Sequence, residues 1–298
     1  MKVKLRKHNW KKEWGEIKEL ASKLKFKYFI PALILPVISM IIFLLPQWIQ
    51  NSLKLVIKQP RMWQFITSAY THNDSSHLFG NLGLYTFLAI LLIYLAFKSS
   101  KVKEFNKALL LSLILFPIIS SIANITIFAR YFTNLQTNCG ASGLVGMMLG
   151  FLPVFWLKSV YPNVKSYFSF MNISALYLAL TLVLVYTKNL FAIVVVTLFL
   201  VGYVIFVRRE FSYLIKQIPL ICKRHFIFFV VSTTAILTFL LTWKFLFPPI
   251  LTASNGTLTN FFTHYIGAVY GIVFSFIIMN FKRSKEKIKS IFHKSSTP

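Results

Sequence analysis

Three short polar segments of the chain carry side chains that could break a peptide bond. In one of them, Ser142 stands within the run Gly140-Ala141-Ser142-Gly143. Glycines beside a serine permit a tight turn at the start of a helix, where unpaired N–H groups can point at the serine. In a second segment, His264 provides an imidazole that can take the proton of a serine hydroxyl. We therefore expect Ser142 to be a nucleophile and His264 its general base.

The third segment, from His72 to Asn81, adds hydrogen-bond donors. His77 and Asn81 are four residues apart, so on a helix they share one face. Donors of this kind can stabilise the negative oxygen that forms when a serine attacks a carbonyl. The chain has no His-Glu-x-x-His motif, and no carboxylate is available as the base of a zinc protease. We therefore expect neither a metal nor a cofactor at this site.

Acidic residues are scarce, and this limits the mechanism. The chain has only 7 Asp and Glu residues, none of them lies in an apolar run, and Asp74 is the one acid expected on the outer side. A carboxylate that orients the base is therefore not expected, and the sequence predicts a Ser–His dyad rather than a triad. After His264 come Gly267 and Gly271, whose small-xxx-small spacing predicts close approach of two helices.

The elements that must position these groups are apolar helices. Hydrophobic residues make up 56% of the 298 residues and charged residues 13%, and the apolar residues form long runs. Residues 172–187 and 190–207 are separated by two residues only, which favours a tight hairpin. The predicted spans are residues 28–48, 78–97, 107–129, 142–157, 172–187, 190–207, 226–247 and 264–281.

Basic residues predict the orientation of the spans. If the N-terminus is cytoplasmic, 27 of the 33 Lys and Arg residues fall on the inner side, so we expect both termini to be inside. Charges clustered between apolar runs orient helices, and this argues against nucleic acid as a partner of this chain with its net charge of +26. We expect a basic segment 1–27, a membrane domain 28–281 and a basic cytoplasmic tail 282–298. The pattern of segment 1–27 fits an amphipathic helix on the inner leaflet and, equally, a solvated basic flank with little structure.

Together the three polar segments resemble the rhomboid family of intramembrane serine proteases. That family has His-x4-His-x3-Asn in the second core helix, Gly-x-Ser-Gly at the start of the fourth and His-x2-Gly-x3-Gly in the sixth. This chain has all three patterns in the same order, over roughly residues 28–157 and 226–281. The resemblance implies an all-α polytopic membrane protein with a rhomboid-like six-helix core, here with about two additional transmembrane helices. It also implies a location in the cell membrane.

The resemblance assigns roles to these residues. Ser142 is implied as the nucleophile and His264 as the base, while His77, Asn81 and the Ser142 backbone N–H are implied as the oxyanion hole. The supporting residues implied are His72, Gly140, Gly143, Gly267 and Gly271. The implied activity is endopeptidase cleavage in or near the transmembrane segments of substrate proteins in the lipid bilayer. The alternative is a catalytically inactive rhomboid-like protein that binds membrane clients.

Two positions depart from the family pattern. Gln64, after Trp63, stands where the family usually has an arginine in the first outer loop, and Gly146 stands where many members carry an aromatic ring that stacks on the catalytic histidine. A transporter is disfavoured because it would predict charged residues buried in the spans or an inverted internal repeat, and the sequence indicates neither.

Overall fold

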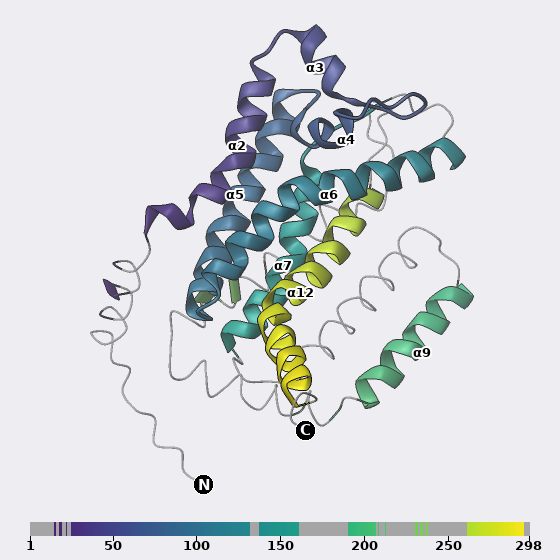
Figure 1. Ribbon diagram of the computed structural model, residues 1–298. Coiled ribbons are helices and arrows are strands. Elements are labelled where there is room, and N and C mark those ends of the chain that lie inside the picture. The colour runs from purple at the N-terminus through teal and green to yellow at the C-terminus, as the bar shows by residue number, and fades with distance from the viewer. Residues whose placement is uncertain are drawn as a thin grey trace.

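The computed structural model describes residues 25–131, 137–160, 190–206 and 261–294, with a few isolated positions besides. This part of the chain is almost entirely helical (Figure 1). The longer elements are α2 (Ile30–Phe43), α5 (Ser75–Lys98), α6 (Val102–Tyr131), α7 (Ser142–Val160), α9 (Leu190–Phe206) and α12 (Phe261–Lys294). The short elements are η1 (Phe26–Tyr28), α3 (Gln47–Leu53), β1 (Leu55–Val56), α4 (Gln64–Thr67), η2 (Ser68–Tyr70) and β2 (Thr137–Asn138).

Four helices of the described residues are long and apolar enough to cross a membrane. Each overlaps one of the predicted spans 78–97, 107–129, 142–157 and 264–281, and the protein is in this respect an all-α membrane protein. The four segments are Ser75–Lys98, Val102–Thr126, Ser142–Ser159 and Phe262–Met279.

The other predicted spans either differ in length from the helices of the structure or lie outside the described residues. The run 28–48 is not one helix, because α2 ends at Phe43 and Pro46, which has no N–H for a helical hydrogen bond, precedes the separate helix α3. Within 190–207, α9 covers 17 residues and is shorter than the four helices above, at the low end of the lengths that cross a membrane. The span 172–187, most of 226–247, and nearly all of the segment 1–27 lie outside the described residues.

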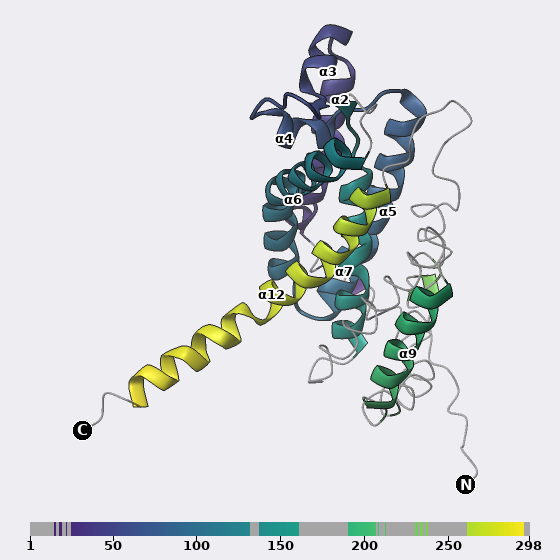
Figure 2. The ribbon, with the colours of Figure 1, turned by 90° about the vertical axis from the view of Figure 1, so that its right-hand side faces the viewer.

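Helix α7 occupies the centre of the bundle. Within its membrane-length window 78% of the residues are buried, more than in the other three long helices. It packs most extensively against α12 and then against α5, and Figures 1 and 2 show it enclosed by these helices and α6. Its side chains Phe151 and Phe155 meet Phe105 of α6 edge to face, with ring centroids 6.3 and 5.4 Å apart. Ser142, its first residue, is thereby fixed at one end of the core.

The contact between α7 and α12 depends on glycines in both helices. A Cβ on Gly271 would lie 3.0 Å from the Cα of Gly150 and would collide with the carbonyl oxygen of Met147. A Cβ on Gly267 would lie 2.9 Å from the Met147 amide nitrogen and collide with the Gly143 carbonyl. The two backbones therefore touch, as the spacing of Gly267 and Gly271 predicts.

Helix α6 contains a proline that frees one of its carbonyl groups. Pro117 has no N–H to donate to the carbonyl of Leu113, four residues earlier. The hydroxyl of Tyr70 donates to that carbonyl at 2.6 Å, so the buried oxygen keeps a partner. Figure 1 shows the second half of α6 leading away from α5 and across the start of α12.

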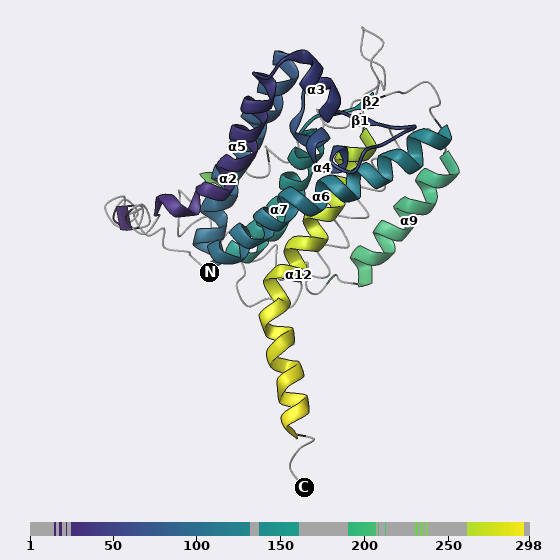
Figure 3. The same cartoon turned by 45° about the horizontal axis from the view of Figure 1, so that its top comes forward.

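Helix α12 is longer than the predicted span. It continues without interruption from Phe261 to Lys294, so residue 281, the predicted end of the membrane domain, is not a helix end. Figures 2 and 3 show its C-terminal half extending away from the bundle.

Substituting the glycines tests the α7–α12 contact. We expect Gly271→Ala to destabilise the protein by about 1–3 kcal/mol, because the new methyl group overlaps the α7 backbone. Gly83→Ala is the matched control: Gly83 lies in α5 with open space around it, so the same change should be neutral or stabilising by up to about 1 kcal/mol. Denaturant unfolding in detergent measures both, and equal effects would contradict the proposed tight contact.

Candidate active site

Ser142 is the first residue of α7, and the backbone before it makes a sharp turn. Gly140 has φ +122°, a conformation that residues with a side chain rarely adopt. The Gly140 N–H donates to the carbonyl of Ser68 at 2.9 Å, and the next N–H, that of Ala141, donates to Nε2 of His72 at 3.2 Å. Two hydrogen bonds from successive residues thus hold the loop that presents the half-buried Ser142.

His72 acts in this loop as a neutral acceptor. Its side chain is 1% exposed, and burial lowers its pKa to about 4, with the neighbouring His77 acting in the same direction. Because Nε2 accepts the bond from Ala141, the proton of the neutral ring is assigned to Nδ1. A protonated ring would have no acceptor atom for the Ala141 N–H. The structure therefore puts His72 in direct contact with the Ser142 loop.

His77 and Asn81 lie on one face of α5, and His77 is beside the same loop. Asp74 caps this helix by accepting a hydrogen bond from the His77 N–H at 2.7 Å. The His77 ring packs against Gly140, since a Cβ on that glycine would lie 2.7 Å from Cε1 of the ring. One turn further along α5, Nδ2 of Asn81 is buried and makes no hydrogen bond. A buried amide without a partner is costly, and it is available to an incoming acceptor.

His264 lies in the first turn of α12 and is 6% exposed. Its backbone rests on α7: a Cβ on Gly146 would lie 2.6 Å from the His264 carbonyl oxygen and 3.2 Å from its Cα. Gly146 is one helical turn after Ser142, so both residues lie on the same side of α7. The first turns of α7 and α12 therefore meet, and an aromatic side chain at position 146 would not fit between them.

These groups provide what attack on a carbonyl requires. The first N–H groups of a helix have no partner within that helix, and those of α7 begin at Ser142. The ring of His77 lies against Gly140 in the loop before the serine, and Asn81 follows one turn later on the same helix, with a buried amide that has no hydrogen bond. Among the described residues, no group of three or more His, Cys, Asp or Glu side chains could hold a metal ion.

The outer loop of the predicted topology, which precedes α5, is held by Gln64, the residue that differs from the pattern of the family that the sequence resembles. Its side chain is 2% exposed; Oε1 accepts from the Arg61 N–H at 3.0 Å, and Nε2 donates to the Ser52 carbonyl at 3.1 Å. Strand β1 of this loop pairs antiparallel with β2, just before the Gly140 turn. A glutamine thus makes several backbone contacts that organise the loop and connect it to the Ser142 segment.

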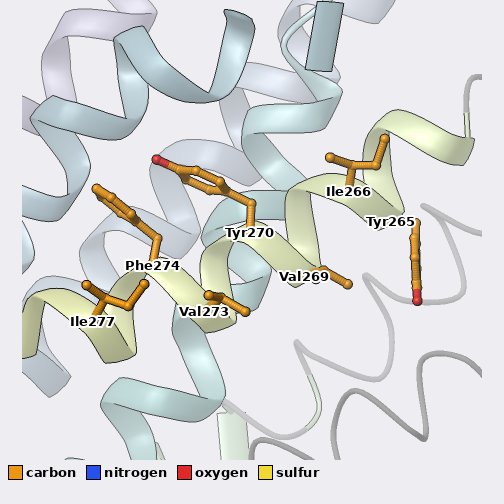
Figure 4. Close-up of a pocket in the computed structure, with 7 residues that line it drawn as sticks. All are labelled: Tyr265, Ile266, Val269, Tyr270, Val273, Phe274 and Ile277. Atoms are coloured by element: carbon orange, nitrogen blue, oxygen red, sulfur yellow. The ribbon is translucent and has the colours of Figure 1, made fainter. Parts of the chain in front are cut away.

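The outward face of α12 bears an apolar groove of about 410 Å³. Figure 4 shows the side chains along this face, from Tyr265 to Ile277. Tyr270 in this row accepts a hydrogen bond from Ser112 at 3.3 Å, and its ring stacks on Phe274 with centroids 5.0 Å apart. Tyr270 thus ties α12 to α6.

Several residues near the site were not among the functional residues predicted from the sequence. They include Tyr70, which completes the hydrogen bonding of α6, and the pair Asn124 and Thr263, joined by a hydrogen bond of 2.9 Å beside His264. Asn124 carries a sequence signal that could have found it, since a polar side chain inside a predicted span needs a partner. The partner itself could not be read from the sequence.

Comparison with known proteins adds no relative: no family model, no curated protein and no solved structure matches this chain.

The role of Gln64 predicts a local loss of stability. Gln64→Ala removes the acceptor of the Val56 and Arg61 N–H groups and one of the two donors to the Ser52 carbonyl, which should cost about 1–3 kcal/mol. Gln47→Ala is the matched control, because Gln47 bonds only to Asn51 on the surface at 3.3 Å and should lose little. Thermal unfolding of both variants in detergent gives the comparison; a loss no larger for Gln64 than for Gln47 contradicts the assigned role.

The lowered pKa of His72 predicts destabilisation by acid. A histidine in the unfolded chain takes up a proton near pH 6.5, whereas buried His72 does so only near pH 4. The neutral ring therefore contributes fully to the free energy of unfolding above pH 6.5. This contribution, at most about 3 kcal/mol, is lost as the pH falls from 6.5 to 4. His72→Gln keeps an acceptor but does not titrate, so its unfolding free energy should vary less over this interval. Identical pH slopes in the two proteins would rule the assignment out.

Proposed function

We propose that this protein is a rhomboid-type intramembrane serine endopeptidase that uses a dyad of Ser142 and His264. The observation that carries the proposal is the convergence of three elements on one loop. His72 accepts a hydrogen bond from the residue before Ser142, His77 packs on the Gly140 turn, and the first turn of α12 with His264 lies against α7 one turn below Ser142. Packing alone would not require a serine and three histidines to lie at the same end of the helix bundle.

In the proposed reaction, Oγ of Ser142 attacks the carbonyl carbon of a substrate peptide bond while His264 takes the hydroxyl proton. The oxyanion is stabilised by the Ser142 N–H together with the side chains of His77 and Asn81. The protonated His264 then gives its proton to the leaving amine, and an acyl-enzyme remains. A water molecule, deprotonated by the same imidazole, hydrolyses the ester and restores the serine.

The buried amide of Asn81 supports this assignment. Its Nδ2 is buried without a hydrogen bond, which is unfavourable in the resting protein. This is expected of a donor whose acceptor, the oxyanion, forms only during the reaction. The neutral state of His72 fits as well, since that ring must remain an acceptor at neutral pH to hold the loop.

The proposed substrates are membrane proteins cleaved in or near their transmembrane segments. A helix must unwind locally before one of its carbonyl groups can be attacked, so cleavage is expected at helix-breaking residues near the outer end of the substrate segment. This orientation follows from the proposed arrangement with both termini inside, as the distribution of basic residues favours, in the cell membrane.

The decisive variant is Ser142→Ala. We expect it to abolish cleavage of a model transmembrane substrate and labelling by a fluorophosphonate, because both need the serine hydroxyl. Ser159→Ala, at the other end of α7, is the matched control and should retain both activities. Asn81→Ala should lower the rate ~10²- to 10³-fold, as loss of one oxyanion donor typically does. Wild-type protein that is folded but neither cleaves nor labels would favour the alternative, a client-binding protein without catalysis.

A further inference from the structure

The hydrogen bond between Thr263 and Asn124 stands directly beside the proposed base. Oγ1 of Thr263 donates to Oδ1 of Asn124 at 2.9 Å, from the first turn of α12 to the second half of α6. The two residues are 7% and 2% exposed, so water does not compete for this bond. Thr263 is the residue immediately before His264.

Thr263 contacts α7 as well as α6. A Cβ on Gly143 would collide with the Cγ2 methyl of Thr263 and would lie 3.0 Å from the ring of Phe116. The methyl group of Thr263 therefore occupies the space that the absence of a side chain at Gly143 leaves open. Its hydroxyl group faces α6. The threonine is held between the helix of the nucleophile and the helix of Asn124.

Asn124 is itself on a well-fixed part of α6. One turn earlier, the hydroxyl of Ser121 donates to the carbonyl of Phe65 at 3.0 Å, which joins α6 to the short helix α4. Further back, Tyr70 completes the hydrogen bonding at Leu113 that Pro117 leaves open. The part of α6 that carries Asn124 is thus tied to the outer segments that also support the Ser142 loop.

Gly146 offers no side chain, so at this position α7 supports His264 through its backbone alone. The hydrogen bond of the adjacent residue, Thr263, adds a directional contact from the same turn of α12 to a second helix, α6. Polar groups at this depth are retained when they have such a role.

We propose that Asn124 is a positioning residue for His264, acting through Thr263; this inference rests on the proposed protease function. The pair fixes the first turn of α12 so that the imidazole stays aligned with the Ser142 hydroxyl. In this protein a hydrogen bond between α6 and α12 does the orienting that a stacked ring at position 146 would otherwise do.

The test compares Thr263→Val, which keeps the shape and removes the hydroxyl, with Thr263→Ser, which keeps the hydroxyl. Thr263→Val and Asn124→Leu should each lower kcat and the rate of fluorophosphonate labelling ~10- to 100-fold, because a shift of about 1 Å in a catalytic group costs this much. KM should change little, since neither residue is expected to touch the substrate. Thr263→Ser should restore most of the rate.

The double variant and a surface control complete the design. Thr263→Val with Asn124→Leu should be no slower than the slower single variant, because both remove the same bond. Thr126→Val, which removes a hydroxyl bonded within α6 on its exposed face, should label at the wild-type rate. All rates are taken per folded protein at a temperature below the unfolding midpoint of every variant.

The outcomes separate this inference from the proposed function. If Ser142→Ala is inactive but Thr263→Val and Asn124→Leu both label at the wild-type rate, the positioning role is wrong and the protease assignment stands. If both variants lose the fold even at low temperature, the pair is structural and the inference is likewise overturned. If folded wild-type protein is never labelled, the proposed function fails first.

Discussion

The close approach of α7 and α12 is the constraint on which the rest of the site depends. Glycines on both helices let the two backbones touch, with Gly150 and Gly271 facing each other and Gly146 beneath the backbone of His264. In a membrane there is no hydrophobic force to bring two apolar helices together, so dense packing of this kind has to do so. The separation of the two helices sets how far the residues at their first turns can be from each other.

The polar groups around the Ser142 loop form a second layer of constraint. His72, His77 and Gln64 belong to the segment around the start of α5, and each contacts the Ser142 loop or the outer loop paired with it. Backbone N–H groups that would otherwise be buried without a partner find acceptors in His72 and Gln64. The same bonds that satisfy these groups fix the geometry of the turn at Gly140.

Gln64 and Gly146, the two positions that differ from the rhomboid pattern that the sequence resembles, have different physical consequences. Gln64 still organises the outer loop, because an amide can both accept from and donate to backbone groups. Because Gly146 has no side chain, α7 and α12 approach more closely there, and the α12 backbone occupies the space that an aromatic ring would fill. We propose the Thr263–Asn124 bond as a further constraint on the turn of α12 that carries His264.

The sequence by itself determined the apolar helices at 78–97, 107–129, 142–157 and 264–281, because hydrophobic runs of that length need no tertiary information. It also indicated the turn at Gly140 and the helix contact at Gly267 and Gly271, since glycine, which has no side chain, permits both a tight turn and close approach of two helices. In the predicted span 28–48 the apolar helix is shorter than expected, because α2 ends at Phe43, before Pro46. Only the tertiary structure decided that His72 accepts from Ala141, that Gln64 holds the loop and that Asn124 meets Thr263. His72 and Ala141, like Asn124 and Thr263, are far apart in the chain, and a hydrogen bond between them exists only once packing has set the distance. Gln64 bonds within its own loop, but the fold of that loop sets which backbone groups it reaches.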